Sequence, residues 1–69
     1  MAAYYVNDNE QASSGDHEVH VSTCAWFHLI ESRTYLGEYS SCYGAVTKAK
    51  TIYLSSDGCA YCCPACHKG

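Results

Sequence analysis

The residues best suited to chemistry in this chain are cysteines gathered near its C-terminal end. Residues 59–67 read CAYCCPACH, which places two Cys-x-x-Cys pairs end to end. The turn between two such cysteines aims backbone amides at both sulfurs, so that the two thiolates can bind one metal ion. A structural zinc ion takes four protein ligands, and each pair therefore needs two more from elsewhere in the chain.

A histidine and a cysteine far upstream provide that second half-site. His20 is followed at the fourth position by Cys24, which puts the histidine on the polar face of an expected strand and the cysteine just past its end. The chain between Cys24 and Cys59 is long enough for a strand and a helix before it returns. The sequence therefore predicts a metal site formed by His20, Cys24, Cys59 and Cys62, with zinc as its structural ion.

Three arrangements stay open for Cys63 and Cys66. The first is that they replace Cys59 and Cys62 in the site. The second is that they bind a second ion together with His67, and the third is that they form a redox pair. A reactive Cys-x-x-Cys normally owes its low thiol pKa to a helix N-terminus or a nearby cation. Only three residues follow Cys66 here, too few for a helix of useful length, which weakens the redox interpretation.

Residues 63–67 also match the Cys-x-x-Cys-His sequence to which c-type haem is attached. Haem attachment requires export, for which no signal is visible. The single methionine, Met1, is implausible as an axial ligand. We therefore do not expect haem.

Other chemistry-bearing side chains are expected to be structural. Cys42 lies on an apolar helix stripe and is interpreted as a core residue, although a disulfide to Cys63 or Cys66 stays open if the protein meets an oxidant. His17 and His28 are expected to be ordinary polar residues. Glu18 is the one carboxylate considered as a hydrolytic base, and it is expected to be a solvated strand residue. No catalytic residue is assigned, and enzymatic activity is not expected.

Size and composition favour a domain that needs a cross-link. Residues 1–69 make one domain at most, and a core of this size leaves little surplus over conformational entropy. The N-terminal residues show no basic region followed by an apolar run, so we expect no secretory signal and no membrane span. We therefore predict the cytoplasm, where six clustered thiols more often bind metal or do redox chemistry than form structural bridges.

The charge balance argues against a nucleic-acid partner. Seven acidic residues outnumber four Lys and Arg residues, which gives a net charge of −3 at pH 7. The few cations are dispersed along the chain and form no basic patch. A chain of this charge gains little from releasing counterions at a phosphate backbone.

The remaining pattern predicts a small α+β fold. Residues 3–7 and 16–22 have strand character and are expected to pair as an antiparallel hairpin around a polar connection at 8–15. Residues 24–30 fit a short helical turn or a packed loop. Residues 34–39 resemble a third short strand, which completes a small antiparallel sheet.

One amphipathic helix is expected to follow this sheet. Ser40 or Ser41 is its N-cap, and apolar residues from Cys42 to Tyr53 recur at helical spacing. Residues 54–58 are turn formers that end the helix, with Gly58 able to take a positive φ. The cysteine knuckle follows at once.

The order of the ligands resembles a known family. His-x3-Cys, an alanine-bearing helix and Cys-x2-Cys are similar to the zinc-binding domain of Ada-type DNA-repair proteins, over roughly residues 20–62. The resemblance implies His20, Cys24, Cys59 and Cys62 as ligands. The basic residues expected around a DNA-contacting knuckle are missing, and Cys63, Cys66 and His67 are additional.

The whole chain also resembles a group of small uncharacterised bacterial proteins. The likeness lies in GDHEVH at residues 15–20 and in the cysteine-rich run at residues 59–67. It identifies a group without supplying an activity.

Two functions follow from these patterns. The first is a non-enzymatic zinc-binding module that contacts another protein through an aromatic surface drawn from seven tyrosines and Trp26. The alternative is a thiol redox or metal-handling protein that uses Cys63 and Cys66.

Overall fold

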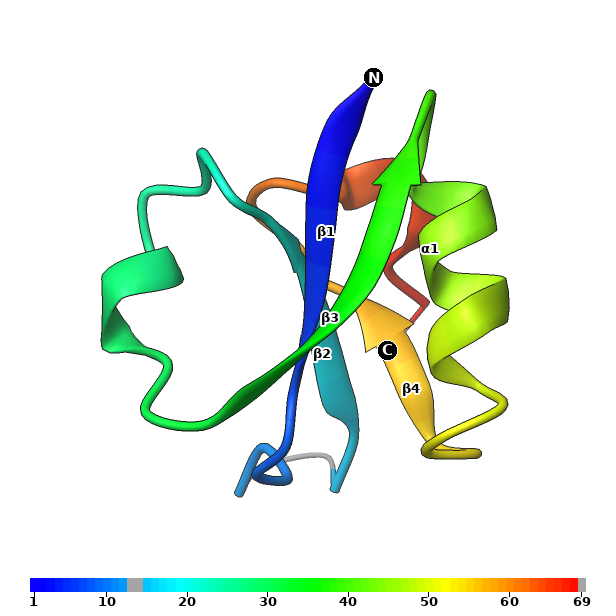
Figure 1. The fold of residues 1–69 in the computed structure, drawn as a ribbon. Helices are drawn as coiled ribbons and strands as arrows, with labels where there is room; N and C mark the ends of the chain where they lie inside the picture. The colour runs from blue at the N-terminus through cyan, green and yellow to red at the C-terminus, as the bar shows by residue number, and fades with distance from the viewer. Residues whose placement is uncertain (13–14, 69) are drawn as a thin grey trace.

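A computed structural model describes residues 1–12 and 15–68 of the chain. Within them the fold is α+β, as predicted, with one α-helix beside a four-stranded sheet (Figure 1). The strands are β1 (Ala2–Asn7), β2 (His17–Val21), β3 (Arg33–Tyr39) and β4 (Ser56–Gly58). The helix is α1 (Cys42–Ala49), and two short 3₁₀ turns are η1 (Phe27–Leu29) and η2 (Pro64–Cys66).

The predicted hairpin is confirmed. β1 and β2 pair antiparallel with Tyr4 opposite Val21 and Val6 opposite Val19. Two residues of the predicted connection, 13 and 14, lie outside the described residues. Of the two forms expected for residues 24–30, the helical turn occurs as η1.

The third strand is also confirmed, and it carries an irregularity. β3 runs antiparallel to β1 on the side away from β2. Tyr4 faces Gly37 but Tyr5 faces Tyr35, so Leu36 is an extra residue in β3. Leu36 is buried in the core, and Gly37 takes a φ of +120° beside it. Such a bulge bends a strand and increases its twist.

The sheet contains a fourth strand that the turn-like sequence of residues 54–58 did not predict. β4 pairs parallel to β2, with His17 beside Ser56 and Val19 beside Gly58, so the sheet is mixed rather than antiparallel. Gly58 does not take the expected positive φ. A Cβ there would lie 2.7 Å from Cys66 Cβ and 2.9 Å from the Cys63 carbonyl oxygen. Glycine is needed at this position because the C-terminal turn passes so close.

The helix begins at Cys42 as expected but ends at Ala49, before the predicted end at Tyr53. The ring of Tyr53 stacks on that of His17 with ring centres 3.8 Å apart. The Tyr53 hydroxyl donates a hydrogen bond to Asp8. These contacts hold Tyr53 toward the sheet, in place of a further helical turn. Ser41 is the N-cap residue, although its side chain makes no capping hydrogen bond.

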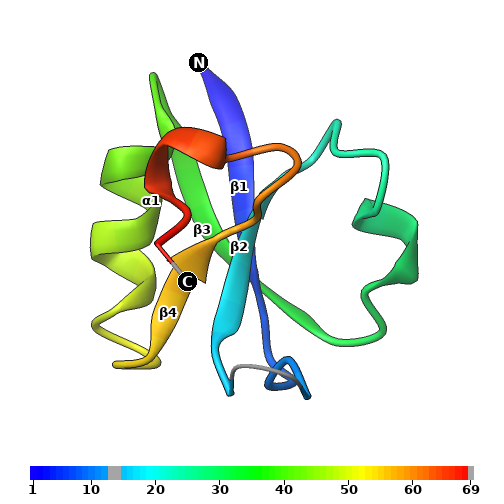
Figure 2. The same cartoon turned by 180° about the vertical axis from the view of Figure 1, so that it is seen from behind.

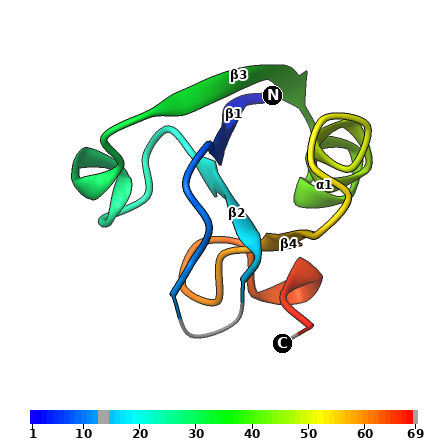
Figure 3. The same ribbon diagram turned by 90° about the horizontal axis from the view of Figure 1, so that it is seen from below.

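The core lies between α1 and the sheet, which curves around the helix (Figure 3). Its members are Tyr4, Val6, Val19, Leu36, Ala45 and Ala49, together with Cys42, Cys63 and Cys66. The alternation predicted for residues 16–22 holds here, because Val19 faces this core while His20 faces the opposite side of the sheet.

The C-terminal segment packs beside α1 and β4, as the view from behind shows (Figure 2). A disulfide joins Cys42 at the start of α1 to Cys66 in η2. Cys42 is therefore buried in the core, as predicted, and is also cross-linked by one of the two pairings that the sequence left open. Within residues 1–12 and 15–68 no helix is both long enough and apolar enough to span a bilayer.

Candidate metal centre

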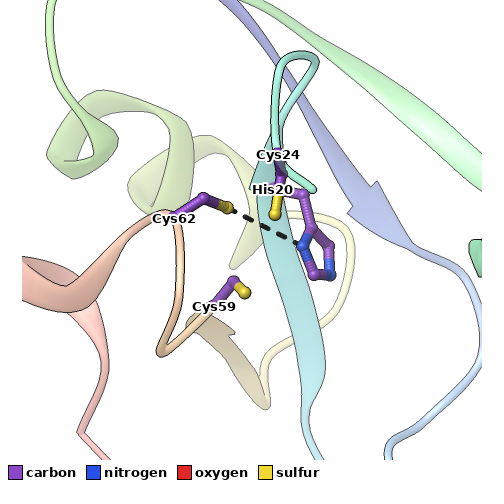
Figure 4. A group of neighbouring side chains, drawn as sticks. All are labelled: His20, Cys24, Cys59 and Cys62. Carbon is purple, nitrogen blue, oxygen red and sulfur yellow. Dashed lines mark hydrogen bonds between the residues drawn. The ribbon is translucent and has the colours of Figure 1, made fainter. Parts of the chain in front are cut away.

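The four residues that the sequence predicts as ligands come together in the structure. One donor atom from each of His20, Cys24, Cys59 and Cys62 lies within 4.8 Å of all the others. Figure 4 shows their side chains converging from separate segments of the chain. His20, Cys24 and Cys59 are buried and Cys62 is partly buried. Among the described residues this is the one His, Cys, Asp or Glu cluster with such geometry.

Parallel pairing of β2 and β4 creates this convergence. Strands that run in the same direction end at the same edge of the sheet, so the segments that follow them are neighbours. β2 carries His20 near its end, and β4 leads directly into Cys59. The Cys59 amide donates to the Val19 carbonyl at 3.0 Å, which fixes Cys59 beside His20.

A tight turn after each strand brings in the other two ligands. After β2, the Cys24 amide donates to the Val21 carbonyl at 2.9 Å. After β4, the Cys63 amide donates to the Cys59 carbonyl at 2.8 Å and closes the turn that contains Cys62. Each strand end therefore supplies one ligand directly and a second through a turn.

The two nitrogens of His20 have different surroundings. Nδ1 lies 3.8 Å from Cys62 Sγ, on the side of the thiols, whereas Nε2 lies 3.5 Å from Glu18 Oε1. A carboxylate beside the outer nitrogen of a ligating histidine favours the tautomer with its proton there, which leaves the inner nitrogen free to bind a cation. Burial lowers the pKa of His20, and this favours the neutral imidazole that metals bind.

The Cys62 thiol is held in a setting that resists ionisation. Burial raises the pKa of Cys62 well above its ordinary value, and the hydrogen bond with Cys24 raises it further. Negative charge on Cys63 and Cys59 acts in the same direction. A divalent ion among these sulfurs would reverse that balance, because a coordinating thiol loses its proton to the ion's charge.

This donor set fits zinc. Three sulfurs and one imidazole nitrogen form a Cys₃His set, one of the usual structural zinc combinations. Tetrahedral zinc bonds of about 2.0–2.3 Å separate neighbouring ligand atoms by roughly 3.5–3.8 Å. The 3.8 Å between His20 Nδ1 and Cys62 Sγ is close to that value. The other donor pairs lie within 4.8 Å, so the side chains would close by at most about 1 Å around an ion.

The three additional candidates do not belong to this group of four. Cys63 is 2 % exposed and packs into the core, with its Sγ 3.9 Å from that of Cys62. Cys66 is bonded to Cys42. His67 lies against β4, where its Nδ1 is 3.0 Å from the Gly58 carbonyl oxygen and 3.4 Å from Asp57 Oδ2. The redox pairing of Cys63 with Cys66 is not the one present in the structure.

The structure gives definite places to the polar residues for which the sequence predicted no special role. His17 is buried and its Nδ1 lies 3.0 Å from the Asn7 carbonyl oxygen. His28 is exposed in η1. Glu18 is only partly exposed, and it lies beside the candidate ligand His20. Sequence reasoning missed this role, although its position two residues from His20 on one strand face was the available signal.

An aromatic pair lies over the two ligand-bearing segments. Trp26 follows Cys24, and Tyr61 lies between Cys59 and Cys62. Their rings meet edge to face with centres 5.9 Å apart, and they are 49 % and 64 % exposed. The pair therefore joins the segments that carry the four candidate ligands while presenting aromatic surface outward.

Comparison with known proteins found no match to a protein-family model, a curated protein or a solved structure.

Proposed function

We propose that this protein is a non-enzymatic binding module in which a zinc ion held by His20, Cys24, Cys59 and Cys62 has a structural role. The observation that carries the proposal is the convergence of these four donors from two distant segments within 4.8 Å. Four protein ligands fill a tetrahedral shell, so no position is left for a reactive water. The ion supplies cross-linking and charge neutralisation, and the chain supplies the surface.

The expected contribution of the ion is large for a chain of this size. Structural zinc in small modules contributes on the order of 10 kcal/mol, comparable with the whole stability of a typical domain. The ligand order also resembles that of the Ada-type zinc-binding domain, which supports zinc as the ion. The net charge of −3 favours a protein partner over nucleic acid.

The surface we assign to partner binding is the pair of Trp26 and Tyr61. Tyrosine and tryptophan are enriched at protein interfaces because their rings offer large contact area at low entropic cost. Both rings belong to segments that the ion would join. Metal binding would thereby hold the contact surface in one shape before the partner arrives.

Metal content tests the first half of the proposal. Native mass spectrometry and elemental analysis of the purified chain should find one zinc ion per molecule. Loading with cobalt should give the absorption of a tetrahedral thiolate complex, and a chelator should abolish the cooperative thermal transition. A chain with no stoichiometric metal, whose melt is unaffected by chelator, would refute the proposal.

The aromatic surface has its own test. Trp26 is the only tryptophan, so its fluorescence should shift to the red when the ion is removed and the ligand-bearing segments separate. A photo-crosslinking residue at position 61 should capture a defined protein partner in cells, whereas the same residue at Leu54, which is 87 % exposed, should not. Equal capture at both positions would argue against this surface.

The second candidate is thiol redox or metal handling through Cys63 and Cys66. It has less support because Cys66 is bonded to Cys42 and Cys63 is buried. Thiol titration of the metal-loaded protein separates the two functions. Uniformly slow thiols favour the structural site, and two fast thiols at positions 63 and 66 favour the alternative.

A further inference from the structure

A groove between α1 and the C-terminal turn is the main feature that the proposed function leaves unused. It has a volume of about 190 Å³. Tyr43, Val46 and Lys50 line it from the helix, and Ala65, Cys66 and Lys68 line it from the C-terminal segment. One of its walls therefore includes half of the Cys42–Cys66 disulfide.

The charges at the groove differ from those of the molecule as a whole. The chain carries a net charge of −3 and four Lys and Arg residues, yet Lys50 and Lys68 both line this groove. The backbone amide of Lys68 donates to both carboxylate oxygens of Asp57 at 3.0 Å, which holds the C-terminal segment in place. Two cations around an apolar surface favour a small ligand that carries a carboxylate.

The two sulfurs of the disulfide are not equivalent. Cys66 lines the groove, whereas Cys42 does not. Cys42 is the first residue of α1, and the Ser41 side chain makes no capping hydrogen bond to the amides of the first turn. A thiolate released at Cys42 would lie at the N-terminal end of α1, where the helix dipole stabilises negative charge. Cys66 is therefore the half of the disulfide that reaches the groove, although only 5 % of its surface is exposed, and Cys42 is the better leaving group.

We propose that the Cys42–Cys66 disulfide is a thiol–disulfide exchange site for small anionic thiols that bind in this groove. The thiolate of the incoming molecule bonds to Cys66 Sγ, the disulfide breaks, and its electron pair goes to Cys42 Sγ. A second thiolate attacks the incoming sulfur, forms the oxidised small disulfide and releases the Cys66 thiolate. Protons from the two thiols end on Cys42 and Cys66, so two thiols are oxidised and one protein disulfide is reduced.

The exchange would change how the C-terminal segment is held. Reduction breaks the covalent link between η2 and α1. Cys59 and Cys62 keep their positions beside His20 and Cys24. This proposal does not depend on the metal site, because neither Cys42 nor Cys66 belongs to the candidate ligand group.

The test compares three reductants of different charge on the metal-loaded, full-length protein. Apart from its sulfur, glutathione is anionic, 2-mercaptoethanol neutral and cysteamine cationic, so the net charge of the reacting thiolates becomes less negative in that order. Each rate is divided by that thiol's rate with a small-molecule disulfide, which removes intrinsic reactivity. Free thiols are trapped with an alkylating agent, located by peptide mass spectrometry and followed together with bound zinc.

We expect the normalised rates to fall in the order anionic, neutral, cationic, and the differences to shrink at high salt. Lys50→Gln and Lys68→Gln should each slow glutathione by about threefold, from the loss of one charge at the distance of the groove. Either variant should slow 2-mercaptoethanol less than glutathione and cysteamine least of all, because the reacting thiolates of these compounds carry progressively less negative charge. Lys48→Gln is the matched control, because Lys48 is exposed on the same helix outside the groove.

Equal normalised rates for the three thiols would overturn the proposal, as would a first mixed disulfide located at Cys42 instead of Cys66. The charge series on the unmodified protein needs no variant, so the test does not depend on the folding of any variant. The absence of zinc from purified protein would refute the proposed metal site and leave this result intact.

Discussion

The two ends of the C-terminal segment are attached to the rest of the molecule by different chemistry. Cys59 and Cys62 face His20 and Cys24 beside β2, where a metal ion would join them. Four residues later Cys66 is bonded to α1 through Cys42. One attachment would be broken by a chelator and the other by a reductant. A short segment that places Cys63 and Cys66 in the core is thus held by a disulfide at one end and, in the proposed site, by a metal ion at the other.

Removing a ligand should have the largest effect on this arrangement. Cys59→Ser should abolish stoichiometric zinc and lower the free energy of unfolding by several kcal/mol, on the order of the contribution of a structural zinc ion. Native mass spectrometry and chemical denaturation measure the two quantities.

Cys63→Ala is the matched control, because Cys63 is buried beside the site but outside the candidate ligand group. It should keep zinc and lose about 2 kcal/mol from a small cavity. Zinc loss from the control alone would show that the ligand set was assigned incorrectly.

Removing the disulfide should have a smaller effect and should leave the ion in place. The bridge spans a sequence separation of 24, and a loop of this length contributes about 3 kcal/mol by restricting the unfolded chain. The double variant Cys42→Ala and Cys66→Ala should lose about that much in urea denaturation with zinc stoichiometry unchanged. If zinc is lost as well, the two attachments are not independent.

A carboxylate beside the site allows a finer test. Glu18→Ala removes the group next to His20 Nε2, and the loss of such a partner typically costs 10- to 100-fold in metal affinity. We expect at least a tenfold weaker zinc affinity in competition with a chromophoric chelator. Glu38→Ala makes the same charge change at an exposed position in β3 and should leave the affinity unaltered. Equal losses in both variants would point to net charge as the cause.

A third attachment, at the other end of α1, is made by hydrogen bonds to Asp8 together with the stacking of Tyr53 on His17. Asp8 accepts from Thr34 at 2.6 Å and from the Tyr53 hydroxyl at 2.9 Å. The bond to Asp8 raises the pKa of Tyr53 above its ordinary value of 10.0. Because the folded pKa is the higher one, this contribution to stability is fully present below the unfolded pKa and is lost as pH rises through the folded pKa.

Asp8→Asn should therefore move the pKa of Tyr53 back toward its ordinary value. An NMR titration of ring-labelled tyrosine measures this shift residue by residue. Tyr4 provides the control, since burial is the main cause of its raised pKa, and its titration should stay where it is. An unchanged Tyr53 titration would mean that this hydrogen bond does not persist in solution.

Sequence periodicity and ligand spacing predicted much of this molecule, because they report local preferences. The hairpin, the third strand, the start of the helix and the four clustered residues were all expected from such signals. β4 was not, because Ser56, Asp57 and Gly58 have turn composition and form a strand only through pairing with β2. The early end of the helix was missed for a similar reason, since contacts of Tyr53 with His17 and Asp8 replace further helical turns.

The same limit applies to the site. The sequence predicted which four residues meet, but the parallel strand that brings Cys59 beside His20 is a long-range contact with no local signal. The choice between Cys63 and Cys66 as the partner of Cys42 was also left open. The pairing with Cys66 depends on the 3₁₀ turn η2, which turns Cys66 toward α1.

The extra residue in β3 has a consequence for self-association. β3 is an edge strand, and a regular edge offers a row of unpaired amides and carbonyls to which a second molecule can add a strand. The bulge at Leu36 and the positive φ of Gly37 interrupt that row and twist it away from a flat template. Straightening this strand would be expected to favour fibrous aggregates.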